Sequence, residues 1–296
     1  MPHRSGTYCC FRICVPNEAG IDARSPIGVF DSGVGGLTVL AALCARLPRE
    51  RFVYLGDTAR LPYGTKSPDT VVRYALQAAD ALVRRGVKAL VIACNTASAV
   101  ALPAMAERYG SLPLLGVVEP GAAAAAAATR SGQIAVIGTE ATVRGGAYQR
   151  AICRRRPDAQ IRAVACQLFV ALAEEGWTDG PVARASAERY LSGLCDTSGT
   201  SGFVADTLVL GCTHFPMLRA TIREVIGEHV CLVDSAATTA EATQGLLQAQ
   251  GLLAPAAPTG ARVQLLATDG VERFALVGTR FLGRPIAPAE VELVDL

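Results

Sequence analysis

The feature that most constrains the fold of this chain is a regular alternation of short apolar runs with helix-like segments. The apolar runs have the length of buried strands, and helical periodicity between them is clear over 71–85 and 182–194. Such alternation predicts parallel sheets built from strand–helix–strand units. The eight expected strands are 27–30, 51–55, 89–93, 114–118, 134–137, 161–165, 207–210 and 230–233.

A local repeat divides this series of strands into two halves. Cys94 lies in LVIACNT (90–96) and Cys212 in LVLGCTH (208–214), each after an apolar run and before a helix-like stretch. The segment that begins at Ile27 is echoed by the segment at Ile134, in the same order and with a similar offset. We therefore expect an α/β protein of two related parallel-sheet domains with pseudo-two-fold symmetry and the active site in the cleft between them. The expected ranges are 26–118 with 234–296 for the first domain, 119–233 for the second, and 1–25 for a disordered N-terminal extension.

The two cysteines are the candidate catalytic residues. Chemistry in α/β sheets is placed at the carboxyl ends of strands, so Cys94 and Cys212 predict one site with two thiols. A thiolate can remove a proton from one face of a carbon centre while a thiol supplies a proton to the opposite face. Such a pair inverts a stereocentre without a cofactor. The alternative is that both are small buried core residues, as free cysteines usually are; the doubled context favours catalysis.

Polar residues near the strand ends are the candidate assistants of these thiols. The glycine-rich loop after the first strand begins with Asp31 and Ser32; it lacks the spacing of a nucleotide-binding loop, but its N–H groups can hold a carboxylate. Asp31 suits an ammonium group or the proton of a thiol. His214 lies two residues after Cys212, where it can exchange a proton with the thiol or attract a substrate carboxylate.

Composition and charge exclude several classes of partner. The formal net charge is +2 and the arginines are scattered, so no nucleic-acid partner is expected. No apolar segment predicts a membrane span, and residues 1–25 lack the apolar core of a signal peptide. We therefore expect a cytoplasmic protein with reduced cysteines, in which Cys9, Cys10 and Cys14 are lone thiols rather than metal ligands.

Five segments together resemble the glutamate racemases of the aspartate/glutamate racemase superfamily. They are IGVFDSGVGGLTV (27–39), GDTARLPYGTKS (56–67), VIACNTASA (91–99), GTEATVRGGAYQ (138–149) and LGCTHFP (210–216). The resemblance covers residues 26 to 234 and continues more weakly to the C-terminus. It implies two α/β domains that interconvert L- and D-glutamate without a cofactor or a metal, and that supply D-glutamate for peptidoglycan synthesis.

The resemblance also implies individual roles. Cys94 would deprotonate D-glutamate and Cys212 would deprotonate L-glutamate, with Asp31 and His214 as their respective polar assistants. Glu174 resembles the family's glutamate near the site. The implied substrate-binding residues are Asp31, Ser32, Tyr63, Gly64, Asn95, Thr96, Thr139, Thr142, Glu174, Thr213 and His214.

Alternatives remain open at the level of sequence. The substrate could be another acidic amino acid such as aspartate, because spacing along the chain does not size the pocket for the distal carboxylate. A protein that binds a partner in place of catalysis is a second class of hypothesis, although both cysteines and their assistants are present. A homodimer is a candidate assembly, since relatives are known to form dimers through different faces.

Overall fold

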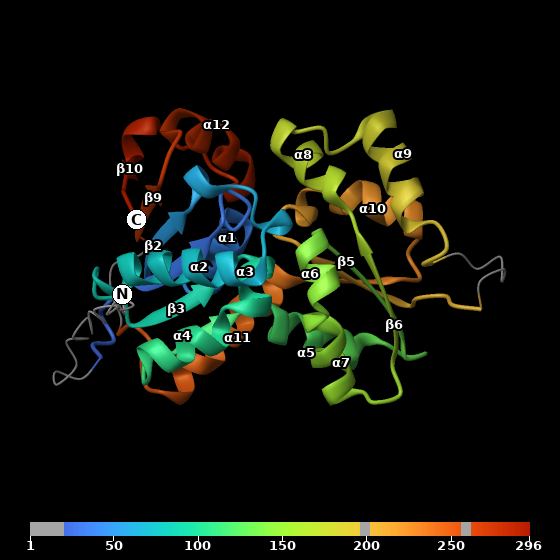
Figure 1. The fold of residues 1–296 in the computed structure, drawn as a ribbon, viewed down its shortest axis with the longest axis horizontal. Coiled ribbons are helices and arrows are strands. Elements are labelled where there is room, and N and C mark those ends of the chain that lie inside the picture. Colours follow the sequence, from blue (N-terminus) through green and yellow to red (C-terminus); the bar gives the residue numbers. More distant parts are fainter. Residues whose placement is uncertain (1–20, 196–201, 256–261) are drawn as a thin grey trace, which may run out of the picture.

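Two separate parallel β-sheets, each flanked by helices, make up the computed structural model (Figure 1). It describes residues 21–195, 202–255 and 262–296. The predicted disordered extension and Cys9, Cys10 and Cys14 fall outside these residues, apart from 21–25. Strands such as β1 (Ile27–Asp31), β3 (Ala89–Ile92) and β7 (Thr207–Gly211) are buried along their whole length, which explains why they are continuous apolar runs in the sequence.

The first sheet has six strands in the order β10-β9-β2-β1-β3-β4, and all neighbours are parallel. Besides β1 and β3, its strands are β2 (Arg51–Gly56), β4 (Leu114–Gly116), β9 (Arg262–Ala267) and β10 (Val291–Leu293). The last two strands were not among those expected from the sequence. They extend the edge of the sheet beyond β2, so the C-terminal part of the chain joins the sheet that begins it.

The second sheet has four parallel strands in the order β6-β5-β7-β8. With β7, they are β5 (Gln133–Gly138), β6 (Gln160–Ala165) and β8 (Cys231–Asp234). This order corresponds to β2-β1-β3-β4 in the first sheet: β5 takes the place of β1, β6 of β2, β7 of β3 and β8 of β4. The predicted α/β class with two related parallel sheets is therefore confirmed, and the two cysteines follow the equivalent strands β3 and β7.

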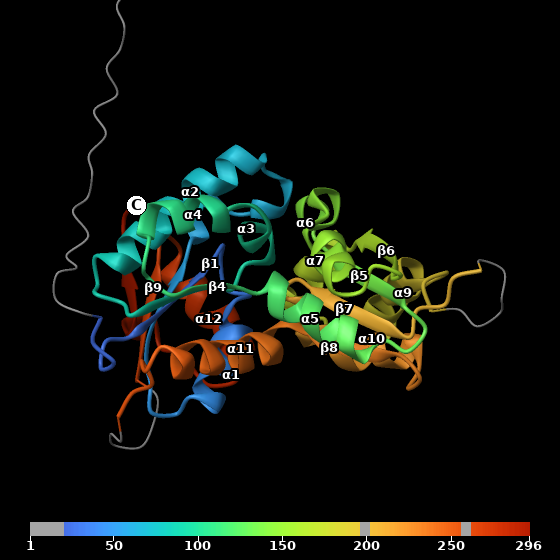
Figure 2. The same cartoon turned by 90° about the horizontal axis from the view of Figure 1, so that it is seen from below.

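The helices after the fourth strand of each sheet pack on the opposite sheet. Helix α5 (Val118–Ala128) follows β4 but packs against β7 and β8, whereas α11 (Ser235–Ala249) follows β8 but packs against α1 (Leu37–Arg46). Figure 2 shows both helices where the two sheets meet. The chain therefore passes between the sheets near residues 118 and 234. The domain ranges inferred from the sequence stay a prediction.

The remaining helices flank the sheets from which they start. Their bounds are α2 (Pro68–Val83), α3 (Asn95–Val100), α4 (Leu102–Tyr109), α6 (Glu140–Gly145), α7 (Ala147–Arg155), α8 (Gln167–Glu175), α9 (Gly180–Leu191), α10 (Arg219–Ile226) and α12 (Val271–Leu282). Within the described ranges, the short 3₁₀ helices are η1 (Thr58–Arg60), η2 (Tyr63–Thr65), η3 (Phe215–Leu218) and η4 (Pro288–Glu290). None of the helices in the described ranges is both long enough and apolar enough to cross a membrane.

One expected strand is shorter than predicted. The range 114–118 was expected to be extended, but β4 ends at Gly116 and α5 begins at Val118. Pro120 lies in the first turn of this helix, where its missing N–H has no helical partner to lose, and the alanine run that follows favours helix. The sequence Glu119-Pro120-Gly121 is thus the start of a helix.

Candidate active site

Cys94 occupies the turn between β3 and α3 and is almost completely buried, with a 5% exposed side chain. It is the N-cap residue of α3, and its Sγ accepts a hydrogen bond from the Ala97 N–H at 3.4 Å. The thiol in turn donates to the Ser32 Oγ at 3.5 Å. Burial, with the nearby charge of Asp31, raises the pKa of Cys94 to about 12. At neutral pH this residue is therefore a protonated thiol.

Cys212 occupies the equivalent turn after β7 and begins a chain of polar contacts. Its Sγ lies 3.8 Å from Nδ1 of His214, and Nε2 of the same ring lies 3.1 Å from Oε1 of Glu174 on α8. The other carboxylate oxygen of Glu174 accepts a hydrogen bond from Arg273 of α12 at 3.2 Å. The relay from thiol to imidazole to carboxylate to guanidinium thus joins both sheets.

The environment of His214 favours the charged imidazole. Burial alone would lower its pKa, but hydrogen bonds with Cys212 and Glu174 outweigh burial and raise the pKa to about 10. The same hydrogen bond from His214 lowers the pKa of Glu174. Both groups are therefore ionised at neutral pH, and a positive charge lies beside the sulfur of Cys212.

The segment that follows β1 contacts the turn that holds Cys212. Gly35 packs so tightly on the Thr213 and His214 side chains that a Cβ at this position would collide with both. Thr38 donates a hydrogen bond from its Oγ1 to the Thr213 carbonyl oxygen at 3.0 Å. Cys212 is also among the groups that raise the pKa of Cys94, after burial and Asp31.

A second set of contacts joins segments that flank the two sheets. The hydroxyl oxygens of Thr96, Thr139 and Thr142 lie 3.0 to 3.3 Å from one another. Gly64 approaches Thr139 so closely that its Cβ would lie 2.8 Å from that of Thr139. The structure therefore brings these four predicted substrate-binding residues into one cluster at the junction of the two sheets.

Two buried polar atoms in this region lack a hydrogen-bond partner. They are Oδ1 of Asp31 and Nδ2 of Asn95, and the only other such atom in the described ranges is Nη2 of Arg60. The Asp31 Oδ2 accepts the Gly33 N–H at 3.0 Å, and burial raises the pKa of Asp31. Unpaired buried donors and acceptors are costly, so one acceptor and one donor near the thiols mark a place for a polar ligand.

Several residues that shape the site were not found from the sequence. Tyr148 donates a hydrogen bond to Oδ1 of Asn95 at 2.7 Å, and its segment GTEATVRGGAYQ was already a recognised motif. Phe281 of α12 packs edge-on against the His214 ring, with 5.2 Å between the ring centroids. Arg280 of the same helix donates a hydrogen bond to the Glu174 carbonyl oxygen at 2.8 Å. No local pattern marks these α12 residues, because only the fold brings α12 to α8.

Among the predicted substrate-binding residues, Tyr63 is one whose hydroxyl group forms its hydrogen bond within its own loop. Its hydroxyl donates to Oδ2 of Asp57, and the side chain is buried. The loop 56–65 is therefore an ordered segment, anchored through Asp57, that places Gly64 against Thr139. Among the described residues, no group of three His, Cys, Asp or Glu side chains is arranged to hold a metal ion.

Comparisons with known proteins extend over most of the chain. The family model described as Asp/Glu/Hydantoin racemase matches residues 32–243. The glutamate racemase of Geobacter metallireducens is 53% identical over 257 residues, which are 87% of this chain and 92% of that protein. Among solved structures, the Thermus thermophilus glutamate racemase in complex with β-chloro-D-alanine has a TM-score of 0.81 and 46% identity, covering 93% of this chain and 98% of that one. The Francisella tularensis glutamate racemase in complex with D-glutamate has a TM-score of 0.82 and 34% identity, covering 92% and 98%.

Proposed function

Because the chain belongs to the Asp/Glu/hydantoin racemase family and is therefore an isomerase, we propose that it interconverts L- and D-glutamate by proton transfer at Cα between two cysteines. The relatives compared above are glutamate racemases, and one of them is in complex with D-glutamate. Nothing in these relatives favours aspartate as the substrate. The observation that carries the proposal is the pair of buried cysteines after the equivalent strands β3 and β7.

The unequal surroundings of the two thiols support a role for each. Cys94 is a thiol at neutral pH, since its pKa is raised to about 12, and can act as the acid. Cys212 lies 3.8 Å from a protonated His214, whose charge stabilises the sulfur when it is an anion, so Cys212 can act as the base. By the family resemblance, the enantiomer that Cys212 deprotonates is L-glutamate.

Each turnover moves two protons and leaves the overall charge unchanged. The Cys212 thiolate takes the Cα proton from one face of L-glutamate and becomes a thiol. The Cys94 thiol gives its proton to the opposite face of the resulting carbanion and becomes a thiolate. Protonation of the carbanion on this face forms D-glutamate. The reverse reaction exchanges the two roles. The unpaired Oδ1 of Asp31 suits the substrate ammonium group, and the unpaired Nδ2 of Asn95 suits a carboxylate.

The wider role follows from the proposed reaction. D-Glutamate made by this enzyme would supply peptidoglycan synthesis, and the protein would work in the cytoplasm as a cofactor-independent racemase. The further substrate-binding residues would be Ser32, Tyr63, Gly64, Thr96, Thr139, Thr142, Glu174, Thr213 and His214. Assembly as a homodimer would appear as a doubled mass in sedimentation analysis.

Solvent exchange in deuterated water tests the assignment of the two cysteines. The variants Cys94→Ser and Cys212→Ser should each lose racemisation almost completely. Cys212→Ser should still exchange the Cα hydrogen of D-glutamate, whereas Cys94→Ser should exchange only that of L-glutamate, because one base remains on one face. Full racemisation in either variant would refute the two-thiol mechanism, and the opposite exchange pattern would refute the assignment. A substrate panel with chiral detection would reveal aspartate as the preferred substrate if glutamate is not.

A further inference from the structure

A cavity of about 570 Å³ lies at the amino ends of strands β1, β2 and β9. The cysteines follow the carboxyl ends of their strands, so the length of the first sheet separates this cavity from the candidate active site. A strand of five or six residues spans roughly 17–20 Å. A ligand in the cavity would therefore not compete directly with substrate. The lining residues are Asp22, Arg24, Ser25, Pro26, Arg51, Phe52, Val53, Arg85, Gly86, Arg262, Val263 and Gln264.

Four of the lining side chains are arginines, and two of them stand in register. Arg51 begins β2 and Arg262 begins β9, and they are direct partners in the parallel ladder. Partners on adjacent strands project from the same face, with strands about 4.8 Å apart. Both side chains are exposed, and an anion that lies against them would offset the repulsion between their like charges.

Acidic groups of the described ranges form an ion pair with only one of these four arginines. Arg24, Arg51 and Arg262 form no ion pair with any residue that the structure describes. Arg85 pairs with Glu292 at 2.7 Å, and the second oxygen of that carboxylate accepts from Gln264. Asp22 is the single acidic residue in the lining, and its Oδ1 accepts the Arg24 backbone N–H.

We propose that this cavity is a binding site for a small anion with two or more phosphoryl groups, held by Arg24, Arg51 and Arg262. A guanidinium presents a planar fork of donors that matches phosphate oxygens in bidentate geometry. Several forks around one concave surface suit a compact ligand that carries several such oxygens. The proposal is independent of the racemase reaction, because the cavity contains none of its residues.

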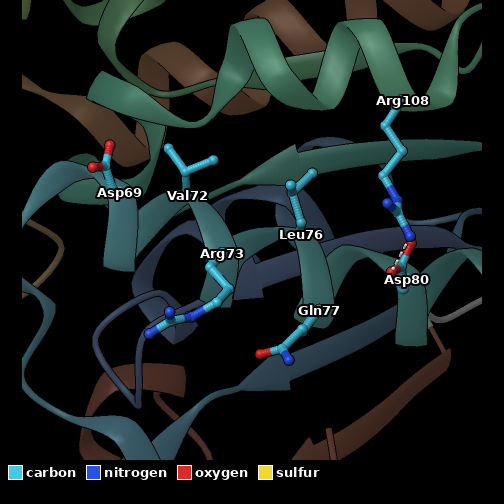
Figure 3. Close-up of a pocket in the computed structure, with 7 residues that line it drawn as sticks. All are labelled: Asp69, Val72, Arg73, Leu76, Gln77, Asp80 and Arg108. Carbon is cyan, nitrogen blue, oxygen red and sulfur yellow. Dashed lines mark hydrogen bonds and ion pairs between the residues drawn. The ribbon is translucent and has the colours of Figure 1, made fainter. Parts of the chain in front are cut away.

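Calorimetric titration with sodium pyrophosphate tests the site on the full-length protein at low ionic strength. Wild-type protein should bind, and the double variant Arg51→Gln/Arg262→Gln should bind at least about tenfold more weakly, because two charge-assisted contacts are lost. Arg73→Gln is the matched control. Arg73 is an exposed arginine in a different pocket on α2, where Asp69 and Asp80 also line the wall (Figure 3). This control should bind pyrophosphate as wild type does.

Thermal unfolding gives a second readout with a defined sign. Without anions, Arg262→Gln should unfold at the same temperature as wild type or a higher one, since like-charge repulsion is removed. With pyrophosphate, wild type should gain stability and the double variant should not. A fall in the unfolding temperature of Arg262→Gln without anions would overturn the argument, and so would equal pyrophosphate binding by all variants. Tighter binding of citrate than of pyrophosphate would refute the assignment of a phosphoryl-containing ligand. Binding of duplex DNA without binding of pyrophosphate would refute the proposal that the ligand is a small anion.

Discussion

Replacing His214 by glutamine tests how much the charge beside Cys212 contributes to catalysis. The perturbation keeps a polar side chain of similar length but removes the positive charge that lies 3.8 Å from the sulfur. Two unit charges at this separation interact by about 4 kcal/mol at an effective dielectric constant of about 20. If this energy stabilises the Cys212 thiolate, its loss lowers kcat/KM by roughly 10³-fold.

The assay follows racemisation from each enantiomer by chiral separation. Enantiomers have equal free energies, so kcat/KM must fall equally in both directions, and that equality checks the data. The direction in which Cys212 is the base is identified by the primary isotope effect on kcat/KM with Cα-deuterated substrate. This effect should increase for L-glutamate more than for D-glutamate in His214→Gln, because proton removal by Cys212 becomes slower.

His229→Gln is the matched control, because the same chemical change is made at an exposed histidine outside the candidate site. It should leave kcat/KM unchanged. A loss of less than about tenfold in a folded His214→Gln protein, against the 10³-fold expected from the charge, would refute the electrostatic role of His214. An equal loss in the control would show that the effect is not specific to the site.

Three further predictions concern stability and the contact between the sheets. Lys88→Met should lower the free energy of unfolding by about 3–5 kcal/mol in urea titration, because removal of the fully buried ammonium group leaves the buried Glu50 carboxylate without its ion-pair partner. An unchanged urea midpoint in this variant would contradict the prediction. The pKa of His214 is raised to about 10, so its stabilising contribution is complete below pH 6.5 and is lost as pH rises through 10. Urea midpoints across this range should fall less in His214→Gln, and identical slopes would refute the linkage. Gly35→Ala should abolish activity with a native circular dichroism spectrum, because the added methyl collides with His214; retained activity would show that the loops can separate.

The repeated strand pattern explains why much of the architecture could be predicted. Fully buried parallel strands consist of continuous runs of apolar residues, which can be recognised in the sequence. The repeat around Cys94 and Cys212 predicted that both thiols lie at equivalent strand ends. The strand expected at 114–118 was wrong beyond Gly116. Val117 is the N-cap residue and Val118 the first residue of a helix whose alanine run outweighs the strand preference of these two β-branched residues.

The contribution of α12 could not be predicted for a different reason. Arg273 on α12 and Glu174 on α8 belong to helices that flank different sheets and are far apart in the sequence, so their contact depends on how the two sheets pack. The same is true of Phe281 against His214. Local patterns encode strand ends and turns, whereas contacts between sheets depend on the complete set of packing interactions.

The exchange of α5 and α11 between the sheets has a consequence for how substrate reaches the thiols. Both sulfurs are buried, with 5% exposed side chains, while the two helices pack against each other where the chain passes between the sheets. The described backbone joins the two sheets only near residues 118 and 234, beside this pair of helices. Opening a path to the thiols between the sheets therefore requires that the contacts of Gly35 with His214 and of Gly64 with Thr139 part, while the hydrogen bonds within each sheet stay intact.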